Sequence, residues 1–251
     1  MIKCNNLFDN QNMKIIGEKG NVKVFEYQRD LSVKQDNAIG AYYAAEMNVR
    51  KRQVLIELNG SPWLLQAGAM QWMAGDVTMG SGIKGVGDFF GKAIASKVTK
   101  ESTVKPEYNG HGLLMLEPTF KHIILIDVAD WGSIVLEDGL FLACEGSIKQ
   151  NVTSRSNLSS AALGGEGLFN LALTGKGIAV LESPVPYEEL IEFELEDDVV
   201  KIDGNMAIAW SNSLKFTVEK SSKSLLGSAV SGEGLVNVYR GTGKILMAPV
   251  L

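Results

Sequence analysis

Three glutamates at equivalent positions of a repeated sequence are the candidates for a catalytic or cation-binding site. The hexapeptides at 165–170 and 232–237 share five of six residues, and both begin Gly-Glu-Gly-Leu. Alignment of the surrounding segments places Glu101, Glu166 and Glu233 at equivalent positions. Carboxylates that met near a pseudo-threefold axis would raise one another's pKa or bind a cation. The alternative, which we favour, is that each glutamate accepts backbone hydrogen bonds in a turn whose glycines take positive φ.

The cysteines and histidines do not form a recognisable catalytic or metal-binding set. Cys144 lies in an apolar run, which indicates a small buried hydrophobic residue. A thiol nucleophile needs a histidine beside it, but His111 and His122 both fall in segments that read as turns, and we expect them at the surface. Two histidines also cannot supply the three-histidine metal set of many double-stranded β-helix enzymes. We therefore expect no enzymatic activity, no bound metal and no cofactor.

Two further motifs have structural interpretations that we prefer to their chemical ones. Residues 80–85 spell G-x-G-x-x-G after a plausible strand. A dinucleotide site would need a βαβ unit and a helix that begins within the glycines, so we interpret the motif as a loop hinge. The acidic stretch at 182–198 could pair carboxylates for acid–base work. Within this stretch, apolar and acidic residues alternate strictly over 191–196, which instead predicts a half-exposed strand with a solvated acidic face.

The elements that must position these residues recur along the chain. Residues 109–117 match 174–182 at an offset of 65, and the segment that begins at Asp138 resembles the one that begins at Asp203. The chain thus divides into an N-terminal extension, residues 1–48, and a single all-β domain, residues 49–251. We expect this domain to consist of three pseudo-symmetric repeats of about 66 residues, at 49–118, 119–183 and 184–251.

Short apolar runs with turn signals between them predict a compact barrel or prism rather than βαβ units. Each repeat also contains one insertion without strand character, at 80–100, 154–164 and 220–231. The first contains Phe89, Phe90 and Ile94 in a stretch that could form a short helix. We expect its apolar face to cap the barrel; the alternative is that it contacts a partner.

Composition and charge exclude several classes of protein. The chain has 27 glycines among 251 residues but only six prolines, so the glycine excess is not a low-complexity linker. It has 24 basic and 29 acidic side chains and a net charge of −5, whereas nucleic-acid binders usually carry a basic footprint. We recognise no leader peptide and no transmembrane segment. We therefore expect a cytoplasmic protein that does not bind nucleic acid.

Taken together, three features resemble the altered inheritance of mitochondria protein 24 family in its bacterial form. They are the segments 67–77 and 138–144 and the Gly-Glu-Gly-Leu turns at Gly165 and Gly232. The resemblance covers about residues 50–251. It implies a fold similar to that of the tryptophan RNA-binding attenuation protein, a short double-stranded β-helix, repeated here within one chain. It implies no catalytic residues, because the family has no established enzymatic motif.

These patterns are compatible with two functions. We favour a non-enzymatic scaffold or protein-interaction module that self-associates or binds a protein partner, because the repeats come without a catalytic constellation. The alternative is a protein that binds a small molecule or carbohydrate with loops at one end of the barrel.

Overall fold

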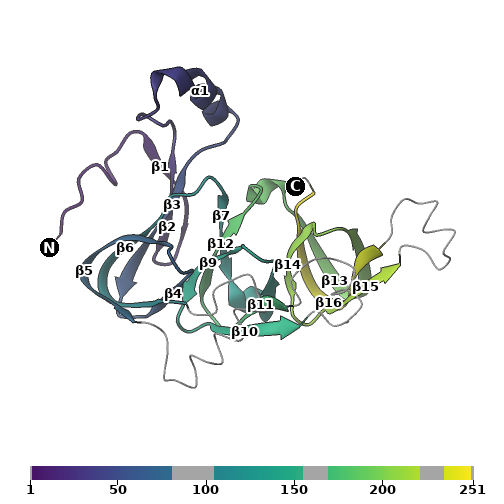
Figure 1. The fold of residues 1–251 in the computed structure, drawn as a ribbon. Helices are drawn as coiled ribbons and strands as arrows, with labels where there is room; N and C mark the ends of the chain where they lie inside the picture. Colours follow the sequence, from purple (N-terminus) through teal and green to yellow (C-terminus); the bar gives the residue numbers. More distant parts are fainter. Residues whose placement is uncertain (1, 81–104, 155–168, 221–234, 250–251) are drawn as a thin grey trace.

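The computed structural model describes residues 2–80, 105–154, 169–220 and 235–249. Two β-sheets and a single α-helix make up nearly all of its regular structure (Figure 1), so the predicted all-β class is confirmed. The first sheet contains β1 (Met13–Lys19), β2 (Val22–Tyr27), β3 (Arg52–Asn59), β4 (Trp63–Leu65), β5 (Met70–Gly80), β6 (Glu107–Leu116), β7 (His122–Asp127), β9 (Phe141–Glu145) and β12 (Ile178–Ser183). The second contains β8 (Ser133–Leu136), β10 (Lys149–Ser154), β11 (Phe169–Thr174), β13 (Ile191–Asp203), β14 (Ala207–Ser211), β15 (Lys215–Lys220) and β16 (Leu235–Met247). The helices are α1 (Ala38–Glu46) and the 3₁₀ turns η1 (Gln35–Asn37), η2 (Val128–Trp131) and η3 (Tyr187–Glu189).

The first sheet is a nearly closed barrel. Its strands follow the order β1-β2-β3-β6-β4-β9-β12-β7, and β5 pairs with β6. The two end strands, β1 and β7, approach each other to within 8 Å between Cα atoms without pairing. Paired strands lie about 4.8 Å apart, so the barrel remains open along this line, which we call the seam.

Strand β12 has no solvent-facing side, because it separates two apolar cores. Ile178 and Val180 pack inside the barrel, whereas Ala179 and Leu181 pack between the two sheets. A strand buried on both faces needs apolar residues at successive positions, which explains why this segment is a continuous apolar run. Such a run cannot show from the sequence which residue faces which core.

The second sheet has a core of its own. Trp210, Phe216 and Tyr239 form an aromatic cluster with ring centroids 5.2–5.8 Å apart. Strand β13 alternates as predicted: Leu195 is buried under the sheet while its acidic neighbours face solvent. The predicted half-exposed acidic strand at 191–196 is therefore confirmed.

The N-terminal segment contributes to the barrel. The hairpin of β1 and β2 joins the first sheet through the pairing of β2 with β3. Residues 28–51, which include α1, then leave the sheet and return to it (Figure 1). The domain boundaries, the three repeats and the attenuation-protein-like topology stay predictions.

Glycine pairs that align in the sequence take two different roles. Gly175 and Gly177 lie in the bend between β11 and β12, as expected for turn glycines. Gly110 and Gly241 instead lie inside the long strands β6 and β16, with φ of 126° and 117°. The interpretation of the segment around Gly110 as a turn was therefore wrong: the chain bends there without leaving the strand.

Candidate functional site

Most of the predicted site residues lie outside the part of the chain that the structure describes. This holds for Glu101, Glu166 and Glu233, and equally for Phe89, Phe90 and Ile94. The G-x-G-x-x-G motif leaves the described residues after Gly80. These hypotheses therefore stay predictions.

The chemistry of Cys144 is that of a buried thiol. Its side chain is inaccessible to solvent between the two sheets, and the Gln150 amide donates to its sulfur at 3.4 Å. Burial raises the pKa of this thiol to about 12, so it is protonated at neutral pH and is a poor nucleophile. The interpretation of Cys144 as a small buried residue is confirmed.

The two histidines lie on different strands of the barrel. His111 is part of β6, with its ring near Gly60, so its predicted position in a turn was wrong. His122 begins β7, so its predicted position in a turn was wrong as well; burial and the nearby Arg52 lower its pKa. Within the described ranges, no group of three or more His, Cys, Asp or Glu side chains is placed to hold a metal ion.

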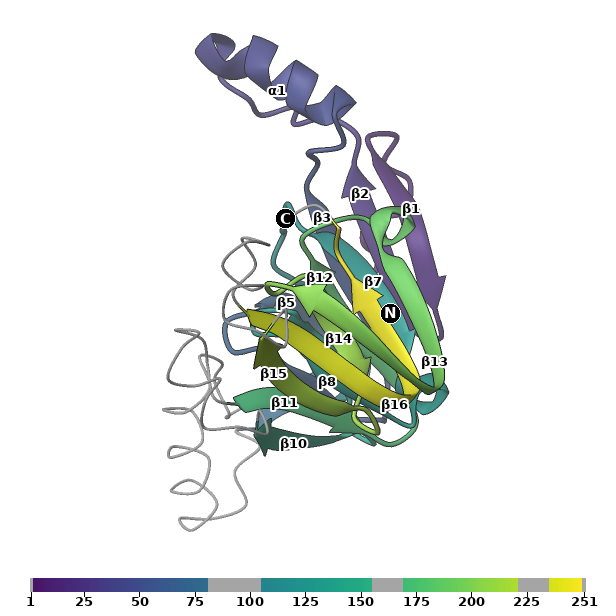
Figure 2. The ribbon, with the colours of Figure 1, turned by 90° about the vertical axis from the view of Figure 1, so that its right-hand side faces the viewer.

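The most conspicuous surface feature is α1, which projects from the end of the barrel in both views (Figures 1 and 2). Its sequence, AIGAYYAAE, carries a single charge, and Ala45 alone among its residues is buried. Ile39 is 75% exposed, Tyr43 is 64% exposed and Met47, which follows the helix, is 77% exposed. A helix with apolar residues around most of its circumference is normally buried against other protein. We call α1 together with Met47 the arm.

The arm is anchored by a buried ion cluster. Glu26, on β2, contacts the guanidinium groups of Arg52 at 2.8 Å and Arg50 at 3.0 Å. Arg52 also donates to the backbone and side-chain oxygens of Asn48, just beyond the helix. Arg50 donates to the carbonyl of Ala45 at the C-terminal end of α1, where a cation also meets the helix dipole favourably. The base of the arm is thus tied to β2 and β3 by charged hydrogen bonds.

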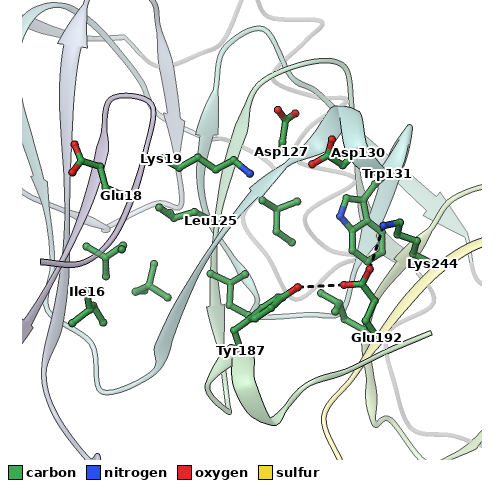
Figure 3. Close-up of a pocket in the computed structure, with 16 residues that line it drawn as sticks. Ile16, Glu18, Lys19, Leu125, Asp127, Asp130, Trp131, Tyr187, Glu192 and Lys244 are labelled. Atoms are coloured by element: carbon green, nitrogen blue, oxygen red, sulfur yellow. Dashed lines mark hydrogen bonds and ion pairs between the residues drawn. The ribbon is translucent and has the colours of Figure 1, made fainter. Parts of the chain in front are cut away.

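A second surface feature is a cavity of about 460 Å³ at the seam (Figure 3). β1 bounds it on one side, and η3, β13 and β16 bound it on the other. Consecutive residues of β7, from Ile123 to Asp127, line it, so the cavity follows the unpaired edge of that strand. The other lining residues are Ile16, Gly17, Glu18, Lys19, Val24, Asp130, Trp131, Tyr187, Glu192, Lys244 and Leu246.

Charged groups surround this cavity unevenly. On one side, the hydroxyl of Tyr187 donates to Glu192, which is also paired with Lys244 at 3.2 Å. On the other, Lys19 extends toward Asp127 and Asp130 (Figure 3). Neither aspartate forms an ion pair within 4.0 Å with any residue that the structure describes. The two carboxylates outnumber the single ammonium group at this end of the cavity.

Neither the arm nor the seam was predicted from the sequence. One signal for the arm was available: residues 38–45 contain no charged side chain within a polar N-terminal segment. The sequence contains no signal for the seam, because the apolar run from Ile123 to Ile126 is typical of any buried strand and does not show that one edge is unpaired. The described residues include no helix long and apolar enough to span a membrane.

Comparison with known proteins identifies the family. An uncharacterized protein of Streptococcus pyogenes serotype M6 is 29% identical over 201 residues, which cover 77% of this chain and 78% of that protein. A crystal structure of a Streptococcus pyogenes protein is 27% identical, covers 81% of this chain and 90% of its own, and superposes with a TM-score of 0.57. The model of the family described as Mitochondrial biogenesis AIM24 matches residues 44–250, which confirms the resemblance found in the sequence. This chain therefore belongs to the Mitochondrial biogenesis AIM24 family.

Proposed function

We propose that this chain is a non-enzymatic protein-interaction module that self-associates through its arm. The observation that carries the proposal is the exposure of Ile39, Tyr43 and Met47 on a helix that projects from the barrel. Apolar groups gathered on one protruding element mark a contact surface, because their burial removes apolar area from water.

A second copy of this chain is the partner that fits the arm best. From Ala38 to Ala45 the helix is uncharged, so it offers no electrostatic preference for a basic or acidic partner. Two arms related by a twofold axis would each bury the aromatic side chains of the other, since such an interface uses the same patch twice. Ile39 and Tyr43 precede residue 44, where the family match begins. Self-association through the arm is thus proposed for this chain rather than for the whole family.

The non-enzymatic part of the proposal rests on Cys144. Its thiol, which would be nucleophilic only as the thiolate, is buried with a pKa of about 12. A function based on binding, in the cytoplasm as expected from the sequence, does not require a reactive thiol at Cys144.

Light scattering on the purified protein tests the proposal. We expect the wild-type mass to be a multiple of 27.1 kDa and the double variant Ile39→Ser/Tyr43→Ser to be monomeric. A matched control, Ile191→Ser/Val199→Ser, changes two exposed apolar residues of β13 and should keep the wild-type mass. A monomeric wild-type protein, or an arm variant that keeps the oligomeric mass, contradicts the proposal.

A second candidate function is the binding of a small molecule or carbohydrate. The observation that favours it is a cavity of about 710 Å³ between α1 and the end of the barrel. Along its wall Tyr27 donates to Gln53 and Gln53 donates to Gln71, and the exposed amide of Gln71 suits a polyhydroxylated ligand. Thermal-shift screening with sugars tests this candidate, since a ligand that binds only the folded state raises the Tm. The Gln71→Ala variant should lose the shift, and a panel without any shift counts against the candidate.

A further inference from the structure

We propose that the free edge of β7 is a docking site for an extended segment of another polypeptide, which would bind as an added β-strand in the seam. The segment we infer has alternating apolar side chains and a basic side chain next to Asp127 and Asp130. This surface is separate from the arm, so the proposal does not depend on self-association.

The backbone of β7 has unused hydrogen-bonding groups. β7 and β12 are antiparallel, and the amide of Val128 donates to the carbonyl of Gly177 at 3.0 Å. In an antiparallel ladder every second residue bonds to the partner strand, so Ile126 and Ile124 bond to β12. The amides of Ile123, Leu125 and Asp127 and the carbonyls of Ile123 and Leu125 therefore point toward the seam, whereas the carbonyl of Asp127 begins η2. β7 is the terminal strand of its sheet among the described residues, so these groups have no strand partner.

Apolar side chains flank this edge on both sides. Ile123 and Leu125 pack partly against the barrel core, and Ile16 of β1 is half-exposed beside the same cavity. On the opposite face, Trp131 and Tyr187 line the cavity near η2 and η3. Successive side chains of a docked strand point to opposite faces, so each would find an apolar surface.

The cavity is suited to a strand in length and charge. β7 has six residues, which corresponds to an edge of about 20 Å. β1 and β7 come within 8 Å of each other, whereas a strand bonded to both edges needs about 10 Å, so we expect the segment to pair with β7 and to push β1 slightly aside. Asp127 and Asp130 leave an excess of negative charge at one end, which a lysine or arginine of the segment would neutralise.

Peptide binding to the full-length protein is the direct test. The probe is a fluorescein-labelled hexapeptide of alternating valine and threonine with a lysine at each end, so that one lysine lies beside Asp127 whether the peptide pairs parallel or antiparallel to β7. A control peptide of the same sequence carries N-methyl groups on the alternate residues that would face β7. We expect saturable anisotropy for the probe, and binding at least about ten-fold weaker for the control because two or more hydrogen bonds are lost.

Variants of β7 identify the edge. Leu125→Pro removes the outward amide without touching the bonds to β12, and proline is tolerated at such positions of edge strands. It should weaken peptide binding about ten-fold or more, whereas Leu125→Ala, which keeps the amide, should weaken it by no more than about three-fold. Asp127→Asn/Asp130→Asn should weaken binding of the lysine-containing peptide but not of a version with glutamine in place of both lysines.

Hydrogen exchange supplies a readout in the wild-type protein. The amides of Leu125 and Asp127 should exchange rapidly in the free protein and become protected in the presence of the probe, while those of Ile124 and Ile126 are protected throughout. Equal binding of the N-methylated peptide, or unchanged exchange at Leu125, would overturn the proposal. So would a failure of the probe to bind together with loss of the oligomeric mass in Leu125→Pro, because the seam would then be filled by a second copy.

Discussion

The two sheets of this protein use the same structural devices in different surroundings. In the first sheet, Glu26 and Arg52 form an ion pair whose side chains are only 8% and 1% exposed. In the second sheet, Glu219 and Arg240 form a comparable pair whose side chains are 38% and 40% exposed. Gly110 and Gly241, which both take a positive φ inside a long strand, differ in the same way. A Cβ at Gly110 would lie 2.0 Å from the carbonyl oxygen of Asp76, whereas one at Gly241 would lie 3.8 Å from its nearest neighbour.

At these two positions the barrel is packed more tightly than the second sheet. The barrel carries both proposed binding surfaces, the arm at one end and the seam along its side. The buried ion cluster ties the base of the arm to β2 and β3, and β12 holds β7 through its one paired edge.

The largest expected effect comes from the buried ion pair. Arg52→Met should lower the free energy of unfolding by about 3–5 kcal/mol, because Glu26 would stay buried with one of its two cations gone. Urea denaturation measures the change. Solvent-exposed ion pairs typically contribute less than about 1 kcal/mol. A loss in that range would show that burial gives the pair of the first sheet no advantage.

The bend glycines should give the next largest difference. Gly110→Ala combines a strained positive φ with a backbone clash, and we expect it to cost about 2–5 kcal/mol. Gly241→Ala has the strain without the clash and should cost about 1–3 kcal/mol. Thermal unfolding of the two variants side by side checks the order; equal losses would show that β6 shifts to make room.

A smaller effect is expected for the exposed ion pair. Arg240→Met should change the free energy of unfolding far less than Arg52→Met does, because solvent screens the exposed pair. The same urea experiment serves as the control for Arg52→Met. A loss as large as that of Arg52→Met would mean that burial does not distinguish the two pairs.

The smallest effect is a pH dependence at Glu219. Hydrogen bonds from Arg240 and Thr217 lower the pKa of this carboxyl from 4.5 to about 2. Because the folded-state pKa is depressed, the stabilisation is present above pH 4.5 and disappears as the pH falls through about 2. Titration of the carboxyl carbon by NMR should show the low pKa in the wild type and a value closer to 4.5 in Arg240→Met. An unchanged pKa in the variant would contradict the assignment to Arg240.

Much of the fold follows from local sequence patterns. The apolar runs at 123–126 and 178–181 and the alternation at 191–196 all correspond to strands. The segment around Gly110 was misjudged, because a glycine with positive φ ends a strand in one context and bends it in another. The contact between Gly110 and Asp76 distinguishes these outcomes, and it joins positions that are far apart in the chain.

The candidate sites were harder to predict for the same reason. Nothing in the sequence of β7 shows that one of its edges is unpaired, because that depends on where β1 lies. Nothing in the sequence of α1 shows that the described residues leave most of it uncovered, because an uncharged helix is ordinarily packed against other protein. The glutamates of the Gly-Glu-Gly turns remain a hypothesis from sequence.

The amino-acid sequence was sufficient to predict the all-β class, the resemblance to the family and the burial of Cys144. These properties depend on residue type and short-range alternation, which can be read directly from the chain. Long-range packing was needed to establish that the barrel stays open between β1 and β7 and that α1 projects from it. A strand has a free edge where no other strand pairs with it. Which strands pair depends on contacts between segments that are distant in sequence, and these cannot be read from a local pattern.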